Sequence, residues 1–274
     1  MRVIECEQGS AQWLKAREGK ITASRMADVL NYNQPTAAQK KDGQTKGKES
    51  QKRADYRTEI IAERLTGLAA DYYVSNDMKW GTEWEASARS AYELATGNFL
   101  EQVGFVLHPT LDYAGASPDG LYRTKGGAEF KCPRSTTHLE YTIAGVVPEL
   151  YIPQMNMEML CCEREWIDFV SFDPRMPQDL QLFIIRHWRN EEAIKAMEAE
   201  VVQFETEINE QIERLYGTAR RRHISDDHEA VPESGLFQSL RGALDEGSTE
   251  GTKGLGGGRG EAQELQSEQG VRSL

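Results

Sequence analysis

The sequence lacks any apolar run of the ~18 residues that a membrane-spanning helix needs. Its opening residues, Met1 to Glu7, also lack the apolar stretch of a secretory signal. It has only four cysteines, and none of them forms a CxxC pair or another zinc-binding spacing. These absences argue against a membrane protein, a disulfide scaffold and a zinc finger. We therefore expect a soluble protein of the cytoplasm.

Positive charge is the scarcer kind, with 32 Lys and Arg residues against 44 Asp and Glu and a net charge of −12. This net negative charge argues against a protein that binds DNA through its overall electrostatic field. It leaves room for a local basic groove, because phosphate contacts depend on where the cations lie. The basic residues at 39–53 fit a solvated, mobile loop, and whether the basic segment 39–57 contacts DNA stays open.

The C-terminal part of the chain differs in composition from the rest. Residues 218–274 hold 10 of the 24 glycines and a single aromatic residue, Phe237. A segment of this kind buries too little apolar surface to offset its chain entropy. We expect a disordered Gly-rich tail at 218–274 and one folded domain at 1–217.

Helix and strand patterns alternate along that domain, with Gly67 and Gly97 placed to end two helices. Helices are predicted over 10–17, from 22 or 24, and over 54–66, 80–96, 136–144, 152–162 and 190–216. Strands are predicted over 99–107, 111–116, 119–123, 127–132, 165–172 and 180–188. This order indicates an α/β fold in which helices flank a central mixed β-sheet.

The segment 117–133 carries the chemistry. Ser117-Pro118-Asp119-Gly120 is a turn signal, and Glu129 and Lys131 project from one side of a strand because side chains alternate. A hairpin between 119–123 and 127–132 would bring Asp119 beside Glu129. Two carboxylates together suit a hard cation such as Mg²⁺, and a nearby lysine can orient a water or stabilise phosphate charge. The spacing alone also fits a turn aspartate and an exposed Glu–Lys pair.

Several ordered motifs resemble the PD-(D/E)xK nuclease superfamily, and within it the lambda exonuclease and YqaJ-like viral recombinase family. The resemblance covers about residues 5–190, and it implies a restriction-endonuclease-like core. Its motifs in this sequence are Glu7-Gln8-Gly9 with Trp13, Arg17 and 19–24, Trp80 to Glu85, Ser117 to Leu121, Glu129 to Pro133, Tyr151 to Gln154, and Asp173 to Met176.

The resemblance implies roles for particular residues. Asp119 and Glu129, with the backbone carbonyl of Phe130, would bind the metal, and Lys131 would position the attacking water. Glu85 would face the same metal site, although Glu83 is close enough to confuse that assignment. A second group would grip the 5′-phosphate of the digested strand: Arg17, Ser24, Ser117 and Gln154. For Ser24 a plain helix cap remains an alternative, and for Gln154 an ordinary helix residue.

The activity that the resemblance implies is that of a Mg²⁺-dependent 5′→3′ exonuclease on linear double-stranded DNA, with Mn²⁺ as a substitute metal. It would release mononucleotides and leave 3′ single-stranded tails for recombination. The family implies a homotrimeric ring, a single-strand annealing protein as partner, and a phage or prophage protein in a bacterial cytoplasm. Two alternatives stay open: a structure-selective endonuclease, and a non-catalytic DNA-binding module on the same fold.

Other conspicuous residues are predicted to be packing residues. Aromatic and methionine side chains at helix and strand spacing are more often core than ligand platforms. This expectation applies to Trp13, Trp80, Trp84, Trp166, Trp188, Met155, Met157, Met159 and Cys132.

Overall fold

The computed structural model describes residues 1–69 and 76–226. It has a compact unit at Met1–Thr218, and a second unit begins at Ala219. The last helix continues to Asp226, and the remainder of the predicted tail, 227–274, lies outside the described residues. Among the helices in the described ranges, none combines the length and the apolar character needed to span a bilayer.

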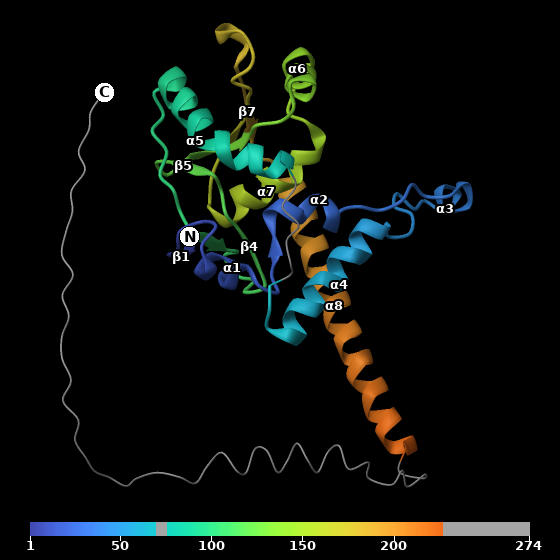
Figure 1. Cartoon of the computed structure of the whole chain (residues 1–274). Coiled ribbons are helices and arrows are strands. Elements are labelled where there is room, and N and C mark those ends of the chain that lie inside the picture. Colours follow the sequence, from blue (N-terminus) through green and yellow to red (C-terminus); the bar gives the residue numbers. More distant parts are fainter. Residues whose placement is uncertain (70–75, 227–274) are drawn as a thin grey trace, which may run out of the picture. The chain divides into compact units, whose positions relative to one another are not determined.

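The helices largely follow the sequence patterns (Figure 1). They are α1 (Ala11–Arg17), α2 (Met26–Val29), α3 (Ala37–Lys41), α4 (Gln51–Thr66), α5 (Asn76–Thr96), α6 (Ser135–Ala144), α7 (Ile152–Cys161) and α8 (Glu191–Asp226), with 3-10 turns η1 (Ala23–Arg25), η2 (Glu149–Tyr151) and η3 (Gln178–Leu180). Gly67 and Gly97 follow α4 and α5 with φ of +67° and +70°, as predicted for helix ends. Helix α4 begins three residues before the predicted start because Ser50 caps it.

In the described part of the chain, eight short strands form two four-stranded sheets where the sequence indicated one central sheet. They are β1 (Arg2–Ile4), β2 (Ile21–Thr22), β3 (Phe105–Leu107), β4 (Ala114–Ala116), β5 (Gly120–Tyr122), β6 (Gly126–Lys131), β7 (Trp166–Phe172) and β8 (Leu182–Trp188). The orders are β1-β3-β4-β2 and β5-β6-β7-β8, and each sheet has one parallel and two antiparallel pairings. Both sheets are therefore mixed, and helices cover them, which confirms the α/β class.

The strand that carries Glu129 and Lys131 lies between two helices. On one face Phe130 and Val170 pack with Ala88 and Tyr92 of α5. On the other face β7 packs through Phe169 against α7, where the methionines 155 and 159 are fully buried. Met157 is also fully buried, so the prediction that these methionines are core is confirmed. This sandwich fixes β6 and its polar side chains relative to α5 and α7.

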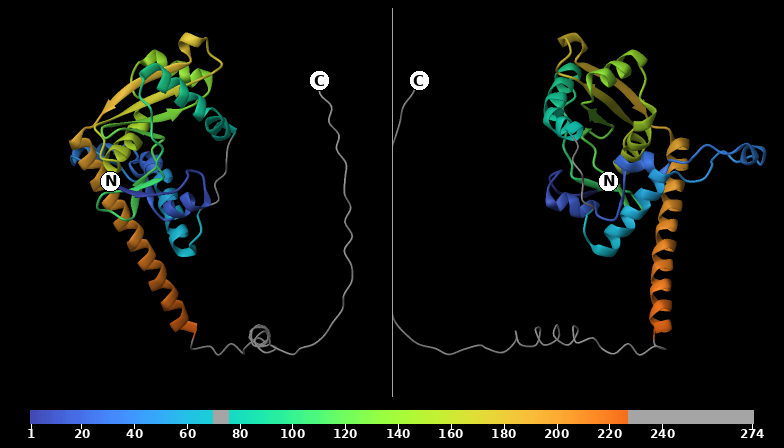
Figure 2. Two further views of the ribbon diagram at one scale, coloured as in Figure 1. Left: turned by 90° about the vertical axis from the view of Figure 1, so that its left-hand side faces the viewer. Right: turned by 45° about the vertical axis from the view of Figure 1, so that its right-hand side comes forward.

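Helices α4 and α8 cross one another (Figure 1) and are joined by a buried ion-pair network. The side chain of Arg53 is 1% exposed and pairs with Glu207 at 2.5 Å, and Arg57 pairs with Glu49 and Glu207. These two arginines are therefore committed inside the protein and are poor candidates for lining a DNA channel. Helix α3 lies at the end of an arm that projects from the rest (Figures 1 and 2), and Lys40 and Lys41 on it are exposed.

Asp168 joins three elements beneath the sheet surface. Its carboxylate accepts hydrogen bonds from Tyr92 on α5 at 2.9 Å and from Arg186 on β8 at 2.8 and 2.9 Å. We expect Asp168→Ala to lower the free energy of unfolding by about 2–4 kcal/mol, because the buried Tyr92 hydroxyl and the Arg186 guanidinium both lose their acceptor. Thermal unfolding followed by circular dichroism measures this as a drop of roughly 5–15 °C. Glu165→Ala, which breaks an exposed pair with Lys125, is the control; equal losses in both variants would contradict the prediction.

Candidate active site

The hairpin predicted from the sequence is present and brings Asp119 to Glu129. Strands β5 and β6 are antiparallel, with Gly120 opposite Ala128. Extending this register by one residue places Asp119 across from Glu129. The Asp119 carboxylate accepts a hydrogen bond from the backbone N–H of Phe130 at 2.7 Å. The hairpin therefore brings the two carboxylates together, as expected, although its turn lies at 123–125 and the Pro-Asp-Gly segment leads into β5.

Glu129 and Lys131 lie on the same face of β6. The Lys131 Nζ donates to Glu129 Oε1 at 2.5 Å, and the Phe130 ring points to the other face, into the α5 cluster. Glu129 is only 1% exposed, and its second oxygen, Oε2, is buried without a hydrogen-bond partner among the described residues. A buried carboxylate oxygen with no partner needs a compensating positive charge or donor.

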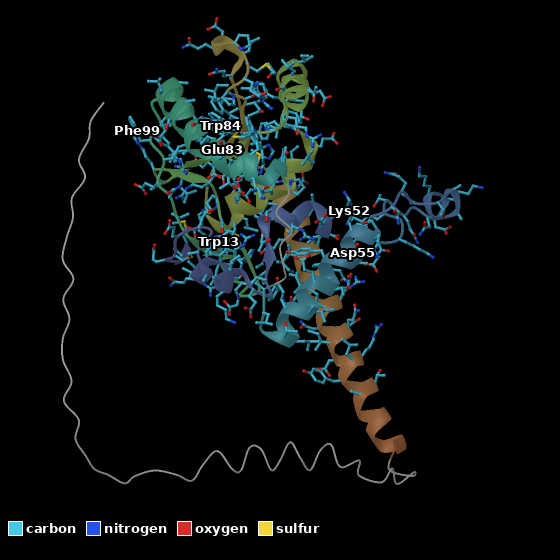
Figure 3. The ribbon with its side chains drawn as sticks, in the orientation of Figure 1. Trp13, Lys52, Asp55, Glu83, Trp84 and Phe99 are labelled. Carbon is cyan, nitrogen blue, oxygen red and sulfur yellow. The ribbon has the colours of Figure 1, made fainter. Side chains whose placement is uncertain are left out.

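Glu85, rather than Glu83, joins this group. Glu83 is exposed on α5 (Figure 3), whereas Glu85 is half-buried and lines a cavity of about 1070 Å³ together with Asp119, Glu129 and Lys131. Burial raises the pKa of Glu85, and the neighbouring Glu129 raises it further. Of the two glutamates that the sequence left open, Glu85 is therefore the one that lines the cavity.

The electrostatics of the cluster favour a bound cation. Burial, followed by the charge of Glu129, raises the pKa of Asp119 well above its usual range. Burial on its own lowers the pKa of Lys131, but the carboxylates of Glu129 and Asp119 outweigh it and raise the pKa. Lys131 therefore stays an ammonium. Lys131 is one positive charge beside the three carboxyl groups of Glu85, Asp119 and Glu129, so this acidic group has a surplus of negative charge when it is ionised, while Arg134 and Arg175 line the same cavity.

The donor set fits a hard divalent cation. Asp119 and Glu129 supply carboxylate oxygens, Glu129 Oε2 has no hydrogen-bond partner among the described residues, and Phe130 with its carbonyl directly follows Glu129 in the chain. Within residues 1–69 and 76–226 no three acidic, His or Cys side chains form a ready ligand cluster. A cation here would complete its shell with water and substrate phosphate oxygens, as Mg²⁺ bound by one or two carboxylates commonly does.

Three of the four residues assigned to the 5′-phosphate come together as a second group. Arg17 on α1 donates from Nη1 to Ser117 Oγ at 3.2 Å and from Nη2 to Ser24 Oγ at 3.3 Å. Trp13 donates to the same Ser117 oxygen at 2.8 Å, and the Arg17 guanidinium lies 4.2 Å from the Trp13 ring centroid. Trp13, Arg17 and Ser24 line a cavity of about 1340 Å³ that also reaches Glu85 and Asp119.

Gln154, the fourth assigned residue, lies with the acidic group. It sits on α7, and its Nε2 donates to Glu129 Oε1 at 2.5 Å and to Glu158 Oε1 at 2.9 Å. Its recorded hydrogen bonds thus join it to the predicted metal ligand and not to the group around Arg17. The resemblance identified a residue of the site but left its partners open, because those depend on how α7 docks on β6.

Two residues of the site were not found by sequence reasoning. Glu158 on α7 is 0% exposed; burial raises its pKa well above the usual range, and the charges of Glu129 and Asp119 add to this. Arg89 on α5 donates to the backbone oxygen of Asp119. Both follow an assigned residue by four positions on the same helix, Gln154 and Glu85. That spacing, which places side chains on one helix face, was the available signal.

The far wall of the first cavity is cationic. Arg175 donates to Asp173 from Nε at 2.7 Å, contacts the Pro133 carbonyl at 3.2 Å and lies 4.4 Å from the Trp80 ring centroid. Burial on its own would raise the pKa of Asp173, but hydrogen bonds from Arg175 outweigh it and hold the pKa at about 2. The Asp173 carboxylate therefore stays ionised near neutral pH and holds the Arg175 guanidinium at the cavity that Lys131 of β6 also lines.

Three tryptophan predictions were wrong. Trp80 was expected in the core, but it is half-buried, lines the first cavity and packs against the Arg175 guanidinium. Trp13 was expected in the core, but it lines the cavity of the Arg17 group and bonds Ser117. Trp188 was also expected in the core, but it is 60% exposed because it ends β8 at an edge of its sheet. Trp166 is buried, and Trp84 packs against the α5 cluster, as expected. Cys132 also packs against that cluster, which agrees with a packing role.

Asp119 lies directly before β5, Glu129 and Lys131 lie on β6, and all three line one cavity. This arrangement defines a nuclease of the PD-(D/E)xK superfamily. The YqaJ-like viral recombinase domain matches residues 12–165, more than half of the chain. The chain belongs to the YqaJ-like viral recombinase family.

Solved structures agree with this assignment. The chain is 38% identical to an alkaline exonuclease, LHK-Exo, from Laribacter hongkongensis, with 77% of this chain and 99% of that chain covered and a TM-score of 0.68. The LHK-Exo complex with dAMP gives the same values. A phage-related exonuclease from Haemophilus somnus 129PT shares the fold at 16% identity and a TM-score of 0.53, covering 74% of this chain and 99% of that chain. Among curated proteins, no sequence matches the chain.

Proposed function

We propose that the protein is a Mg²⁺-dependent 5′→3′ exonuclease that degrades the 5′-ended strand of linear double-stranded DNA to mononucleotides. This proposal rests on one observation, that two cavities adjoin and share lining residues. The cavity of the acidic residues and the cavity of the Arg17 group share Thr82, Glu85 and Asp119. A 5′-phosphate held at Arg17 would therefore place the next phosphodiester bond of its strand at Asp119 and Glu129.

Each residue group has a role in this reaction. The Arg17 guanidinium and the Ser24 and Ser117 hydroxyls would bind the terminal phosphate, since a guanidinium fork matches two phosphate oxygens. Asp119, Glu129 and the Phe130 carbonyl would hold the cation, with Glu85 beside them. The cation, when bound, would neutralise charge on the scissile phosphate and acidify a water. Lys131, fixed next to Glu129, would orient that water for attack on phosphorus.

The relatives support the same reaction. LHK-Exo is described as an alkaline exonuclease, and its complex with dAMP holds a 5′-mononucleotide. For this chain we propose that such mononucleotides are the product and that the 3′ single-stranded tails serve recombination by strand annealing. Mn²⁺ is expected to replace Mg²⁺, because both accept oxygen ligands.

The assembly and setting are part of the proposal. A homotrimeric ring would enclose the duplex and let an acidic chain stay on DNA, with an annealing protein as partner in the cytoplasm of a phage-carrying bacterium. The exonuclease domain would span 1–217. Sedimentation equilibrium at working concentration tests the ring, for which a monomer would be the contradicting result.

A linear duplex with one 5′-phosphate and one 5′-hydroxyl end tests the activity. With Mg²⁺ we expect fast loss of the 5′-phosphorylated strand alone, and with EDTA no loss. Cleavage of covalently closed circles would instead indicate the endonuclease. DNA binding without loss of either strand, with Mg²⁺ or Mn²⁺, would indicate the non-catalytic module.

A further inference from the structure

Arg175 and Trp80 line the first cavity, and the proposed reaction gives them no role. Both oxygens of the buried Asp173 carboxylate accept hydrogen bonds from Arg175, Oδ1 from Nε at 2.7 Å and Oδ2 from Nη2 at 3.0 Å. The Pro133 carbonyl accepts from Nη2 as well, and the Trp80 ring centroid lies 4.4 Å from the guanidinium. Burying a charged pair seldom stabilises a fold, so stability alone explains Asp173 poorly. The contacts hold the guanidinium in one place and one orientation.

These contacts leave one guanidinium nitrogen of Arg175 available to a ligand. Nε and Nη2 are directed at Asp173 and Pro133, whereas neither N–H group of Nη1 has an acceptor among the described residues. The Arg175 side chain is 46% exposed, and it lines the cavity. It therefore presents two donors and a fixed positive charge, which suit the oxygen atoms of an anion.

The start of α6 lies beside Arg175 and has the same character. Ser135 hydrogen-bonds Asp173, and Arg134 and the threonines at 136 and 137 line the same cavity. The carboxylates that would hold the metal line this cavity from β6 and from the residue before β5 instead. An anion such as a DNA phosphate is therefore attracted to the α6 side of the cavity and repelled by the carboxylates, unless a cation covers them.

The lining of the two cavities places Arg175 on the 3′ side of the scissile bond. In the proposed reaction the 5′-phosphate lies at Arg17, in the second cavity, and the scissile phosphate lies at Asp119, which both cavities share. Arg175 lines only the first cavity. A strand that passes from Arg17 through Asp119 therefore continues into the part of the first cavity that Arg175 lines, with the nucleotides that follow the scissile bond.

We propose that Arg175, held by Asp173 and stacked on Trp80, binds a phosphodiester of the digested strand on the 3′ side of the scissile bond. The inference rests on the proposed exonuclease function, and its ligand is the DNA backbone. Together with the Arg17 group, Arg175 holds the strand on both sides of the scissile phosphate. Its contact persists when the mononucleotide leaves, so Arg175 keeps the shortened strand on the enzyme between cleavages.

The first test is the affinity of Arg175→Ala for a 5′-phosphorylated duplex, measured by fluorescence anisotropy with Ca²⁺ in place of Mg²⁺ to slow cleavage. Loss of a charged hydrogen bond to phosphate should weaken binding about tenfold. The slope of log affinity against log salt concentration should fall by about one. Arg175→Gln should behave alike; it loses the charge but keeps an amide donor for the buried Asp173, which Arg175→Ala leaves unpaired. Wild-type affinity and slope in both variants would overturn the proposal.

Arg123→Ala is the matched control. Arg123 also places its guanidinium over an aromatic ring, 5.1 Å from the Tyr122 centroid, but it is exposed and lines neither cavity. Its variant should keep the wild-type affinity and salt slope. If Arg123→Ala weakens binding as much as Arg175→Ala does, the effect is one of net charge, and the site at Arg175 is refuted.

The second test locates the phosphate that Arg175 binds. Single linkages of the digested strand, counted from its 5′ end, are replaced by neutral methylphosphonates. In the wild type we expect the second or third linkage to lose about tenfold in affinity on replacement, and in Arg175→Ala the same replacement should cost little more, because two groups in contact are not additive. Equal losses in both proteins at these linkages would overturn the proposal, and coupling at the first, scissile linkage alone would overturn the 3′ placement.

The binding measurement separates this inference from the proposed function. If the wild type degrades no DNA in Mg²⁺ but shows the coupling between Arg175 and the second or third linkage, the proposed function fails and the binding role stands. If the wild type is an active exonuclease without this coupling, the binding role fails alone. A wild type that binds no duplex overturns both.

Discussion

Lys131→Ala is expected to reduce the rate of strand degradation by at least about 10³-fold, since it removes both the group that orients the attacking water and a positive charge at the reacting phosphate. The lysine is fixed for this role: its Nζ lies 2.5 Å from Glu129 Oε1 and 4.9 Å from the Tyr151 ring centroid. Its ammonium also offsets the charge of the carboxylates at Asp119 and Glu129. Single-turnover degradation of an end-labelled duplex in saturating Mg²⁺ measures the chemical step directly.

Lys125→Ala is the control for that experiment. Lys125 is in the same hairpin, but its side chain is 67% exposed and pairs only with the exposed Glu165. Such pairs contribute about 0–1 kcal/mol, so its rate should stay within about twofold of the wild type. A Lys131→Ala enzyme that retained more than about a tenth of the wild-type rate would remove the lysine from the chemical step.

Arg17→Ala is expected to abolish the preference for phosphorylated ends. A hydrogen bond to a charged partner contributes about 1.5–3 kcal/mol, which corresponds to a roughly 10- to 100-fold slower rate on 5′-phosphorylated ends. Hydroxyl ends should be degraded as slowly as by the wild type, because they lack the group that Arg17 binds. Arg17→Lys should recover only part of the preference, since an ammonium keeps the charge but loses the fork.

The competition between the two ends of one duplex measures this preference. Lys15→Ala, on the same helix α1, is the control, because Lys15 is exposed and pairs with Glu18 on the protein surface. An Arg17→Ala enzyme that still selected the phosphorylated end would move the phosphate site away from the Arg17, Ser24 and Ser117 group.

The sequence by itself determined what depends on neighbours along the chain. Strand alternation put Glu129 and Lys131 on one face, and the hairpin predicted between 119–123 and 127–132 brings Asp119 to them. The helix ends at Gly67 and Gly97 were predictable because glycine readily adopts a left-handed backbone, and both residues do so in the structure. These features arise within a few residues of one another, so local patterns suffice to predict them.

The tertiary structure decided what depends on packing between distant segments. Gln154 bonds Glu129 because α7 docks beneath β6, and the same docking buries Glu158. Arg53 looked like part of a basic loop, but the crossing of α4 and α8 buries it against Glu207. Trp188 has the apolar character of a core residue, yet it ends an edge strand and stays exposed. A side chain of given type and local spacing can be buried or exposed. Whether it is buried depends on whether another helix or strand packs against it.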